Sequence, residues 1–138
     1  MIVLDASAVI ELLMGSRAGT AVTERIQADA TLPRSLALVD LEVANTLRRL
    51  VRLGELDVRR AGEAVLDLAA FALVRFPHTP FLGRIWQLRD RLSAYDAAYV
   101  ALAEELGAPL LTLDARLARA GGHRAKVEHV GAPDGLGP

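Results

Sequence analysis

The chain has 138 residues, of which 52% are hydrophobic and 24% charged, a composition typical of one globular domain with its own core. It has no cysteine, which excludes disulfides, thiolate metal sites and a catalytic thiol, and its apolar runs fall short of the roughly 20 residues that a bilayer span needs. A net charge of −1 argues against a surface that binds nucleic acid all over, so any such contact would be local.

Apolar periodicity, glycine and proline breakers, and N-cap residues divide the chain into alternating strands and helices. In chain order we predict a strand at 2–4, a helix after Asp5, a helix at 17–28, a strand at 30–32, a helix at 36–53, a helix from Asp57 to about 70, a strand at 72–76, a helix opened by Pro80, a helix from Ser93 to Gly107, a strand at 109–113, a short helix and a strand at 126–130. This alternation predicts an α/β fold with a mainly parallel sheet. A single domain over residues 1–130 would precede a frayed tail at 131–138, which is rich in glycine and proline.

Two aspartates directly follow predicted strands. Asp5 comes after the first strand, and Asp114 comes after the strand that ends at Leu113. In open parallel sheets, ligands bind beyond the carboxyl ends of the strands, so both aspartates are placed to meet in one crevice. The alternative for each is an ordinary N-cap of the helix that follows.

Two more carboxylates lie on helices. Asp96 begins a helix that is otherwise almost free of ionisable side chains and is expected to be packed on most sides; a capping box with Ser93 is the alternative explanation. Glu42 shares its helix with Val43 and Leu47, which are predicted to face the core, and a solvated polar stripe is the alternative for Glu42.

If these four carboxylates converge, they cannot all stay ionised without help. Two carboxylates about 4 Å apart repel by roughly 4 kcal/mol at an effective dielectric constant of 20. Either some of them protonate, or a divalent cation neutralises them. Oxygen ligands without histidine or cysteine favour Mg²⁺ or Mn²⁺, and His78, His123 and His129 lack the spacing of a metal site.

Four segments of the chain resemble the PIN-domain family, and more narrowly the VapC-type toxins of bacterial toxin–antitoxin pairs. They are IVLDASA at 2–8, LEVANTLRR at 41–49, YDAAYVALA at 95–103 and LTLD at 111–114. The resemblance covers nearly the whole chain, from residue 2 to residue 130. Four motifs in the family's order and spacing are much more specific than any one of them.

The resemblance implies a three-layer α/β/α sandwich around a mainly parallel sheet of about five strands, Mg²⁺- or Mn²⁺-dependent cleavage of RNA, a homodimer, and inhibition by a cognate VapB-type antitoxin. It implies that the acidic set is Asp5, Glu42, Asp96 and Asp114, with Ser7, Asn45 and Thr112 as supporting polar groups. Asp5 and Asp96 would be the principal metal ligands, Glu42 a ligand or the orienter of the attacking water, and Asp114 a ligand of a second ion. The family often has a further acidic residue after its fourth motif, and its replacement here by Arg116 and Leu117 puts that second ion in doubt.

RNA would need positive groups around an acidic centre. The candidates for RNA contact are Arg48, Arg49, Arg52 and Arg116. A solvated helix face is the alternative for these arginines. Tyr95, Tyr99 and Trp86 are candidates for stacking on a base, with a place in the core as the alternative.

Two other functions compete with a nuclease. A phosphatase of the haloacid-dehalogenase type also begins with a strand ending in aspartate, but it needs a second aspartate where this chain has Ser7, and a lysine better placed than Lys126. A PIN-type binding module without catalysis would have no use for four mutually repelling carboxylates. The absence of cysteine and of a basic leader before Asp5 leads us to expect a cytoplasmic protein.

Overall fold

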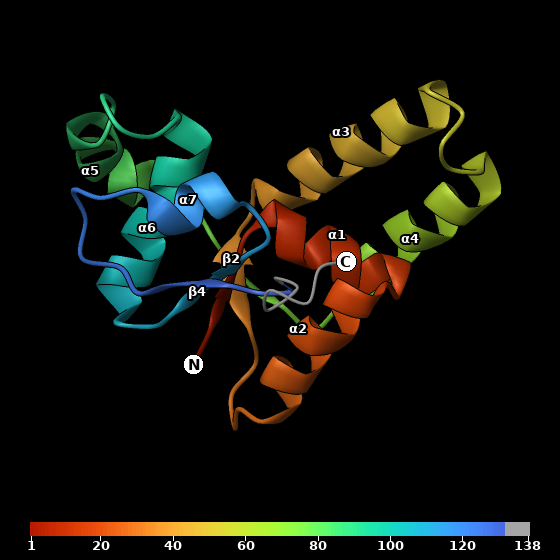
Figure 1. The fold of residues 1–138 in the computed structure, drawn as a ribbon, viewed down its shortest axis with the longest axis horizontal. Coiled ribbons are helices and arrows are strands. Elements are labelled where there is room, and N and C mark those ends of the chain that lie inside the picture. The colour runs from red at the N-terminus through yellow and green to blue at the C-terminus, as the bar shows by residue number, and fades with distance from the viewer. Residues whose placement is uncertain (132–138) are drawn as a thin grey trace.

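Five parallel strands form one sheet within residues 1–131, the part of the chain that this computed structural model describes (Figure 1). The elements are β1 (Val3–Leu4), α1 (Ala6–Met14), α2 (Arg17–Gln27), β2 (Arg34–Leu36), α3 (Val39–Arg52), α4 (Val58–Ala70), β3 (Val74–Phe76), the short 3₁₀ helix η1 (Thr79–Phe81), α5 (Leu82–Gln87), α6 (Ala94–Leu106), β4 (Leu110–Thr112), α7 (Ala115–Arg119) and β5 (Val127–His129). The strand order is β3-β2-β1-β4-β5, and each neighbouring pair is parallel. The predicted α/β fold with a mainly parallel sheet is therefore confirmed.

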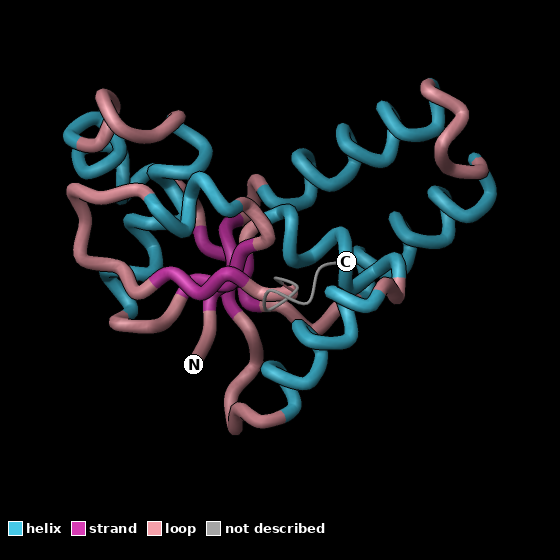
Figure 2. Tube along the Cα trace, viewed as in Figure 1, coloured by secondary structure: helices cyan, strands magenta, loops and turns pink. Residues whose placement is uncertain are grey.

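Helices cover both faces of this sheet, as the three-layer prediction requires. In Figure 2 the strands lie in the middle, with α1 and α2 to one side and α5 and α6 to the other. Helices α3 and α4 pack against each other and against α1, and their far ends project away from the sheet as an arm (Figure 1). No helix in residues 1–131 is both long and apolar enough to cross a membrane.

The core is built on the two central strands and on α6. Both residues of β1 and the leucines of β4 are fully buried. Seven successive residues of α6, from Ala97 to Ala103, are also buried, because the helix is enclosed by the sheet, α5 and η1. This confirms that the helix carrying Asp96 is packed on most sides. Its first turn reaches the carboxyl edge of the sheet, where the polar residues gather.

The prediction for the second strand was wrong by about four residues. We predicted a strand at 30–32 ended by Pro33, whereas β2 begins directly after this proline and α3 begins at Val39. The Asp29 side chain accepts a hydrogen bond from the N–H two residues later, which bends the chain before Pro33. Pro33 has no N–H to donate, but it is tolerated immediately before a strand.

Other boundaries differ by one or two residues. The strands predicted at 72–76, 109–113 and 126–130 are each shorter in the structure, and the helix opened by Pro80 is divided into η1 and α5. Apart from Gly131, the tail predicted at 131–138 lies outside the described residues.

Candidate active site

Asp5 and Asp114 lie side by side at the carboxyl edge of the sheet. They follow β1 and β4, which are neighbouring parallel strands. Each is also the N-cap of the next helix: Asp5 accepts a hydrogen bond from the Ala8 N–H at 3.0 Å, and Asp114 accepts one from the Arg116 N–H at 2.9 Å. Both aspartates are therefore N-caps and also lie at the predicted edge of the sheet. Capping fixes the direction of both carboxylates.

Two hydroxyl groups join Asp5 to the loop that carries Asp114. Ser7 Oγ donates to Asp5 Oδ1 at 2.6 Å and accepts from the Leu113 N–H at 2.9 Å. Thr112 Oγ1 donates to Asp5 Oδ2 and accepts from the Asp114 N–H at 3.0 Å. Each hydroxyl therefore uses its proton on Asp5 and a lone pair on the backbone of the loop after β4.

Asp5 is almost completely buried, at 5% exposure. Burial raises its pKa, the hydrogen bonds from Ser7, Thr112 and Ala8 lower it in part, and the charge of Asp114 raises it further. Oδ1 already accepts two of these hydrogen bonds, whereas Oδ2 accepts one among the described residues. Oδ2 therefore keeps a lone pair with which it could bind a cation.

Asp96 lies in the first turn of α6, where the Ser93 hydroxyl caps the helix by accepting from the Asp96 N–H at 3.1 Å. Burial raises the pKa of Asp96, and the negative charges of Asp114 and Asp5 raise it further. The contact with Ser93 and the positive charge of Arg116 lower the pKa of Asp96 in part. The aspartate is thus close enough to Asp5 and Asp114 to share their electrostatic field.

Glu42 lies in the first turn of α3 and is held from the opposite side of the site. Its Oε1 accepts a hydrogen bond of 2.6 Å from the hydroxyl of Tyr99, a residue of α6 that is only 1% exposed. Burial raises the pKa of Glu42, the Tyr99 hydrogen bond lowers it, and the charges of Asp5 and Asp96 raise it. Burial, followed by the contact with Glu42, raises the pKa of Tyr99, which therefore stays a donor.

The four predicted carboxylates are therefore brought into one electrostatic cluster, in which the pKa of Asp5, Glu42 and Asp96 is raised by burial and by the other members. An all-oxygen set of this kind suits a hard divalent cation chemically. As the side chains stand, no three His, Cys, Asp or Glu residues within residues 1–131 are grouped as the ligands of one ion would be. The donor chemistry fits Mg²⁺ or Mn²⁺, and a cation bound here would oppose the burial and the mutual repulsion that raise the pKa of Asp5, Glu42 and Asp96.

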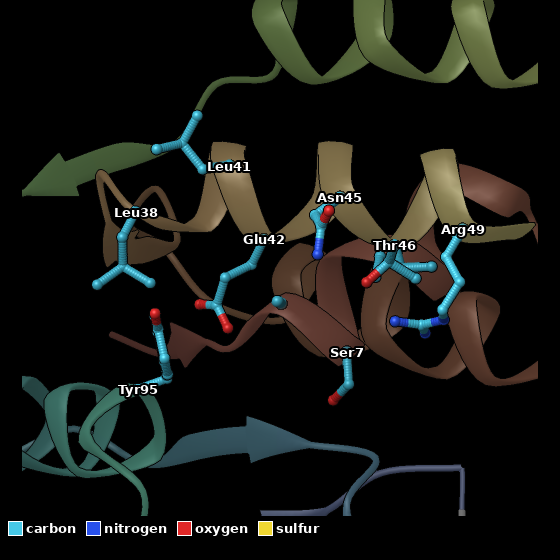
Figure 3. Close-up of a pocket in the computed structure, with 10 residues that line it drawn as sticks. Ser7, Leu38, Leu41, Glu42, Asn45, Thr46, Arg49 and Tyr95 are labelled. Atoms are coloured by element: carbon cyan, nitrogen blue, oxygen red, sulfur yellow. The ribbon is translucent and has the colours of Figure 1, made fainter.

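A pocket of about 690 Å³ opens beside Glu42, between α1, α3 and the start of α6 (Figure 3). Its lining residues are Ala6, Ser7, Ile10, Leu38, Leu41, Glu42, Asn45, Thr46, Arg49 and Tyr95. We refer to it below as the α3 pocket. It contains three residues that the sequence marked as supporting polar groups or RNA contacts, namely Ser7, Asn45 and Arg49.

The other predicted RNA contacts lie outside this pocket. Arg48 and Arg52 are exposed on other parts of α3, and Arg116 is exposed beside Asp114, with 3.8 Å between its Nε and Oδ1 of the aspartate. Of the three aromatic candidates, only Tyr95 lines the pocket. Tyr99 is buried and holds Glu42, so the stacking role considered for it was wrong; Trp86 is exposed elsewhere, under the guanidinium of Arg89.

Sequence reasoning missed some of the residues that shape the site. Asn45 was named as a supporting polar group, but the hydrogen bond that holds Glu42 comes from Tyr99, 57 positions along the chain. Thr46 was not singled out, although it lies one helical turn beyond Glu42 and the 3.6-residue period could have found it. His129 was set aside as a metal ligand; it is exposed, and its Nε2 lies 3.1 Å from the carbonyl oxygen of Leu113, the residue before Asp114.

The phosphatase alternative is not supported by the position of the lysine. Lys126 immediately precedes β5, at the amino end of a strand that is parallel to β4. Asp5 and Asp114 lie at the carboxyl ends of their strands, so the lysine is at the opposite edge of the sheet. It cannot reach a phosphate held by these aspartates.

Comparisons with known proteins identify the family to which the chain belongs. The model of the PIN domain family matches residues 2–123. The chain is 40% identical over 130 residues to "Ribonuclease VapC12" of Mycobacterium tuberculosis, covering 94% of this chain and 99% of that protein, and 44% identical over 126 residues to "Ribonuclease VapC9" of the same species, covering 88% and 91%.

Solved structures have the same fold. PAE2754 from Pyrobaculum aerophilum matches with a TM-score of 0.63 and 25% identity, covering 84% of this chain and 81% of that one. VapC20 of Mycobacterium tuberculosis, described as a toxin that cleaves the sarcin–ricin loop, matches with a TM-score of 0.65 and 17% identity, covering 86% and 93%, and is evidence for the fold alone. The chain belongs to the PIN domain family and, within it, to the group of the VapC ribonucleases.

Proposed function

We propose that the protein is a Mg²⁺- or Mn²⁺-dependent endoribonuclease that acts as the toxin of a toxin–antitoxin pair. The observation that carries this proposal is the meeting of four carboxylates from four separate segments in one electrostatic cluster beside a pocket. Membership of the VapC ribonuclease group supports RNA as the substrate. A binding module without catalysis would keep the repulsion among these carboxylates and have no use for it.

Asp5 and Asp96 would hold the ion, because Asp5 keeps a free lone pair and both sense the charge of Asp114. When bound, a divalent ion supplies positive charge to the scissile phosphate and lowers the pKa of the attacking water. Glu42, fixed by Tyr99, would orient that water through its second oxygen. Asp114, anchored as an N-cap, would complete the acidic set.

Attack by water would leave 5′-phosphate and 3′-hydroxyl ends on the RNA. Ends that carry a 2′,3′-cyclic phosphate would instead indicate attack by the ribose hydroxyl and would contradict the proposal. Mapping the ends of the cleaved RNA is therefore the simplest check on the mechanism.

The activity test uses purified protein, transfer and ribosomal RNA as probes, and Mg²⁺ with or without EDTA. We expect cleavage that EDTA abolishes and that the Asp5→Asn variant lacks, since Asp5 is the best-anchored carboxylate of the cluster. The matched control is Asp67→Asn, which removes an exposed carboxylate on α4 and should leave cleavage unchanged. Cleavage that persists in Asp5→Asn and in EDTA would refute the nuclease.

The proposed partners are the RNA, a VapB-type antitoxin and a second copy of the chain, all within the cytoplasm. The toxin assignment makes a specific genetic prediction: a small antitoxin gene lies next to the gene of this protein, and its product copurifies with the protein and suppresses the cleavage. Light scattering of the protein alone tests the homodimer.

A further inference from the structure

The α3 pocket has two chemically different ends, with Glu42 and Asn45 between them (Figure 3). One end has the ring of Tyr95 with Leu38 and Leu41, and the other has the guanidinium group of Arg49. We propose that this pocket is a nucleotide subsite, in which an unpaired base next to the scissile phosphate stacks on Tyr95 while Arg49 holds the RNA backbone. This inference rests on the proposed function and names the substrate feature that the same site would recognise.

The aromatic end is exposed to a degree that a core role does not explain. Tyr95 is 61% exposed and Leu41 is 75% exposed, and both line the pocket rather than pack inside the protein. Every nucleobase has a flat face that stacks on such a ring. Tyr95 immediately precedes Asp96, so a base stacked there would lie next to the carboxylate cluster.

The opposite end has a positive charge that no neighbour neutralises. Among the described residues, the guanidinium of Arg49 makes no ion pair and no hydrogen bond, and Figure 3 shows it turned into the pocket. Arg75, in contrast, is held by Asp40 through several hydrogen bonds near 3.0 Å. A guanidinium group presented in this way suits a phosphate, which it can bind through two parallel hydrogen bonds.

The order of these groups along α3 favours RNA over a peptide. From Leu38 to Arg49 the helix extends for roughly 16 Å, at 1.5 Å per residue. Along that length come the apolar side chains of Leu38 and Leu41 opposite Tyr95 of α6, then the carboxylate Glu42, and then the Asn45 amide and the Arg49 cation. In this order, a base of a single strand would lie on Tyr95, the scissile phosphate beside Glu42, and the next phosphate beside Arg49. A base inside a duplex is already stacked and paired, so the site would accept only unpaired nucleotides.

Photocrosslinking tests the position of the base without requiring cleavage. A random-sequence single-stranded RNA containing 5-iodouridine is irradiated with the intact protein and with Asp5→Asn in Mg²⁺, and the crosslinked peptide is identified by mass spectrometry. We expect a crosslink at Tyr95. Trp86 is the internal control, because it is even more exposed, at 68%, and lies outside the pocket. A crosslink at Trp86 in preference to Tyr95, or none at Tyr95 in either protein, would overturn the inference.

Binding of the same RNA, followed by fluorescence anisotropy at several salt concentrations, tests both ends of the pocket. Tyr95→Ala should weaken binding about fivefold or more, the loss that follows removal of one stacked base, and Tyr95→Phe should restore it. Arg49→Ala should reduce the slope of log Kd against log salt by about 0.7, whereas Arg48→Ala, on the same helix but outside the pocket, should change it less.

The outcomes separate this inference from the proposed function. If the protein cuts RNA but Tyr95→Ala binds and cuts it like the unmodified protein, the subsite is wrong and the nuclease stands. If Tyr95 crosslinks to RNA but no cleavage occurs, the nuclease is wrong and the subsite stands. If Tyr95→Ala keeps its affinity for RNA and loses affinity for the antitoxin, the pocket docks a protein and the inference is overturned.

Discussion

Single hydroxyl groups set the positions of the carboxylates in this site. The Thr112 hydroxyl is buried and connects Asp5 to the N–H of Asp114, and the Tyr99 hydroxyl connects α6 to Glu42 on α3. The first connection runs along one edge of the sheet, and the second crosses between two helices. Both replace hydrogen bonds that water would otherwise make to these carboxylates.

Replacement of Thr112 by valine should lower the stability of the protein and loosen the positions of Asp5 and Asp114. Valine has nearly the same shape, but it leaves a buried Asp5 oxygen and the Asp114 N–H without their partner. We expect the free energy of unfolding to fall by about 1–3 kcal/mol, because that is the penalty for unsatisfied buried polar groups. Urea denaturation in metal-free buffer measures it, and Thr112→Ser, which keeps the hydroxyl, is the control. Equal stability of the two variants would show that the hydroxyl contributes nothing.

The sequence was informative for some of these residues and not for others. Asp5 and Asp114 could be placed at one edge because each directly follows a strand, and the strands proved to be neighbours. Ser7 and Thr112 were named through the family resemblance. The contact of Tyr99 with Glu42 could not be predicted, since it joins helices 57 residues apart, and their relative position depends on the packing of the whole sheet.

At the level of elements, close helix packing depends on one small residue. Gly19, in α2, lies so near α1 that an added Cβ would be 2.0 Å from the carbonyl oxygen of Glu11. Backbone atoms of a helix cannot move aside as a flexible side chain can. Helix α1 follows directly after its N-cap Asp5 and lines the α3 pocket, so a displacement of α1 would reach the site.

Replacement of Gly19 by alanine should therefore destabilise the protein, by about 1–3 kcal/mol or more, because overpacking forces the two helices apart. Gly62→Ala is the matched control: Gly62 lies within α4, and an added Cβ there would meet nothing within 4 Å. That control should be stabilised by up to about 1 kcal/mol through helix propensity. Thermal unfolding of both variants checks the difference, and a Gly19→Ala protein as stable as Gly62→Ala would contradict the close packing.

Most elements could be predicted because their boundaries are marked locally. Ser93 and Gly107 delimit α6, and Asp57 caps α4, as their residue types suggested. The position of β2 could not be obtained in this way. Only one of its three residues, Leu36, is apolar, so the strand has no apolar pattern of its own. Pairing with β1 and β3, rather than local propensity, decides where the strand begins after Pro33.

At the scale of the whole molecule, the fold gathers negative charge at one edge of the sheet, although the net charge of the chain is only −1. The pKa values of Asp5, Glu42 and Asp96 are raised above their ordinary values, with burial as the main cause. Ion pairs elsewhere in the protein lower the pKa of their carboxylates. Examples are Glu104 beside Arg84 and Asp29 beside the N-terminus. We call the edge that carries Asp5, Glu42 and Asp96 the acidic edge. It is the region where folding makes carboxylates harder to ionise.

These shifts predict the pH dependence of stability in the metal-free protein. Between the ordinary pKa and the raised one, the folded protein binds more protons than the unfolded chain, so the acidic edge contributes a loss of stability as the pH rises. Asp29 and Glu104, whose pKa values are lowered, make stability rise with pH instead. Their effect is confined to the pH range below their ordinary pKa values of 3.8 and 4.5. Calorimetry in EDTA from about pH 4.5 to about pH 8 should show a Tm that falls, and Asp5→Asn should flatten the fall.

Mg²⁺ should reverse this loss, because it neutralises the carboxylates only where they are ionised. Its addition should raise Tm more at about pH 8 than at about pH 4.5. A metal-free Tm that rises with pH over this range, with no larger gain from Mg²⁺ at the alkaline end, would contradict the electrostatic account.

Crystals soaked in Mn²⁺ and measured at the manganese absorption edge test most directly whether the four carboxylates serve one metal site. The account predicts an anomalous peak at the carboxyl edge of β1 and β4, with Asp5 and Asp96 among its ligands, and no such peak in Asp5→Asn. An ion bound elsewhere on the protein, or Arg49 or Arg116 lying among the carboxylates in its place, would contradict it.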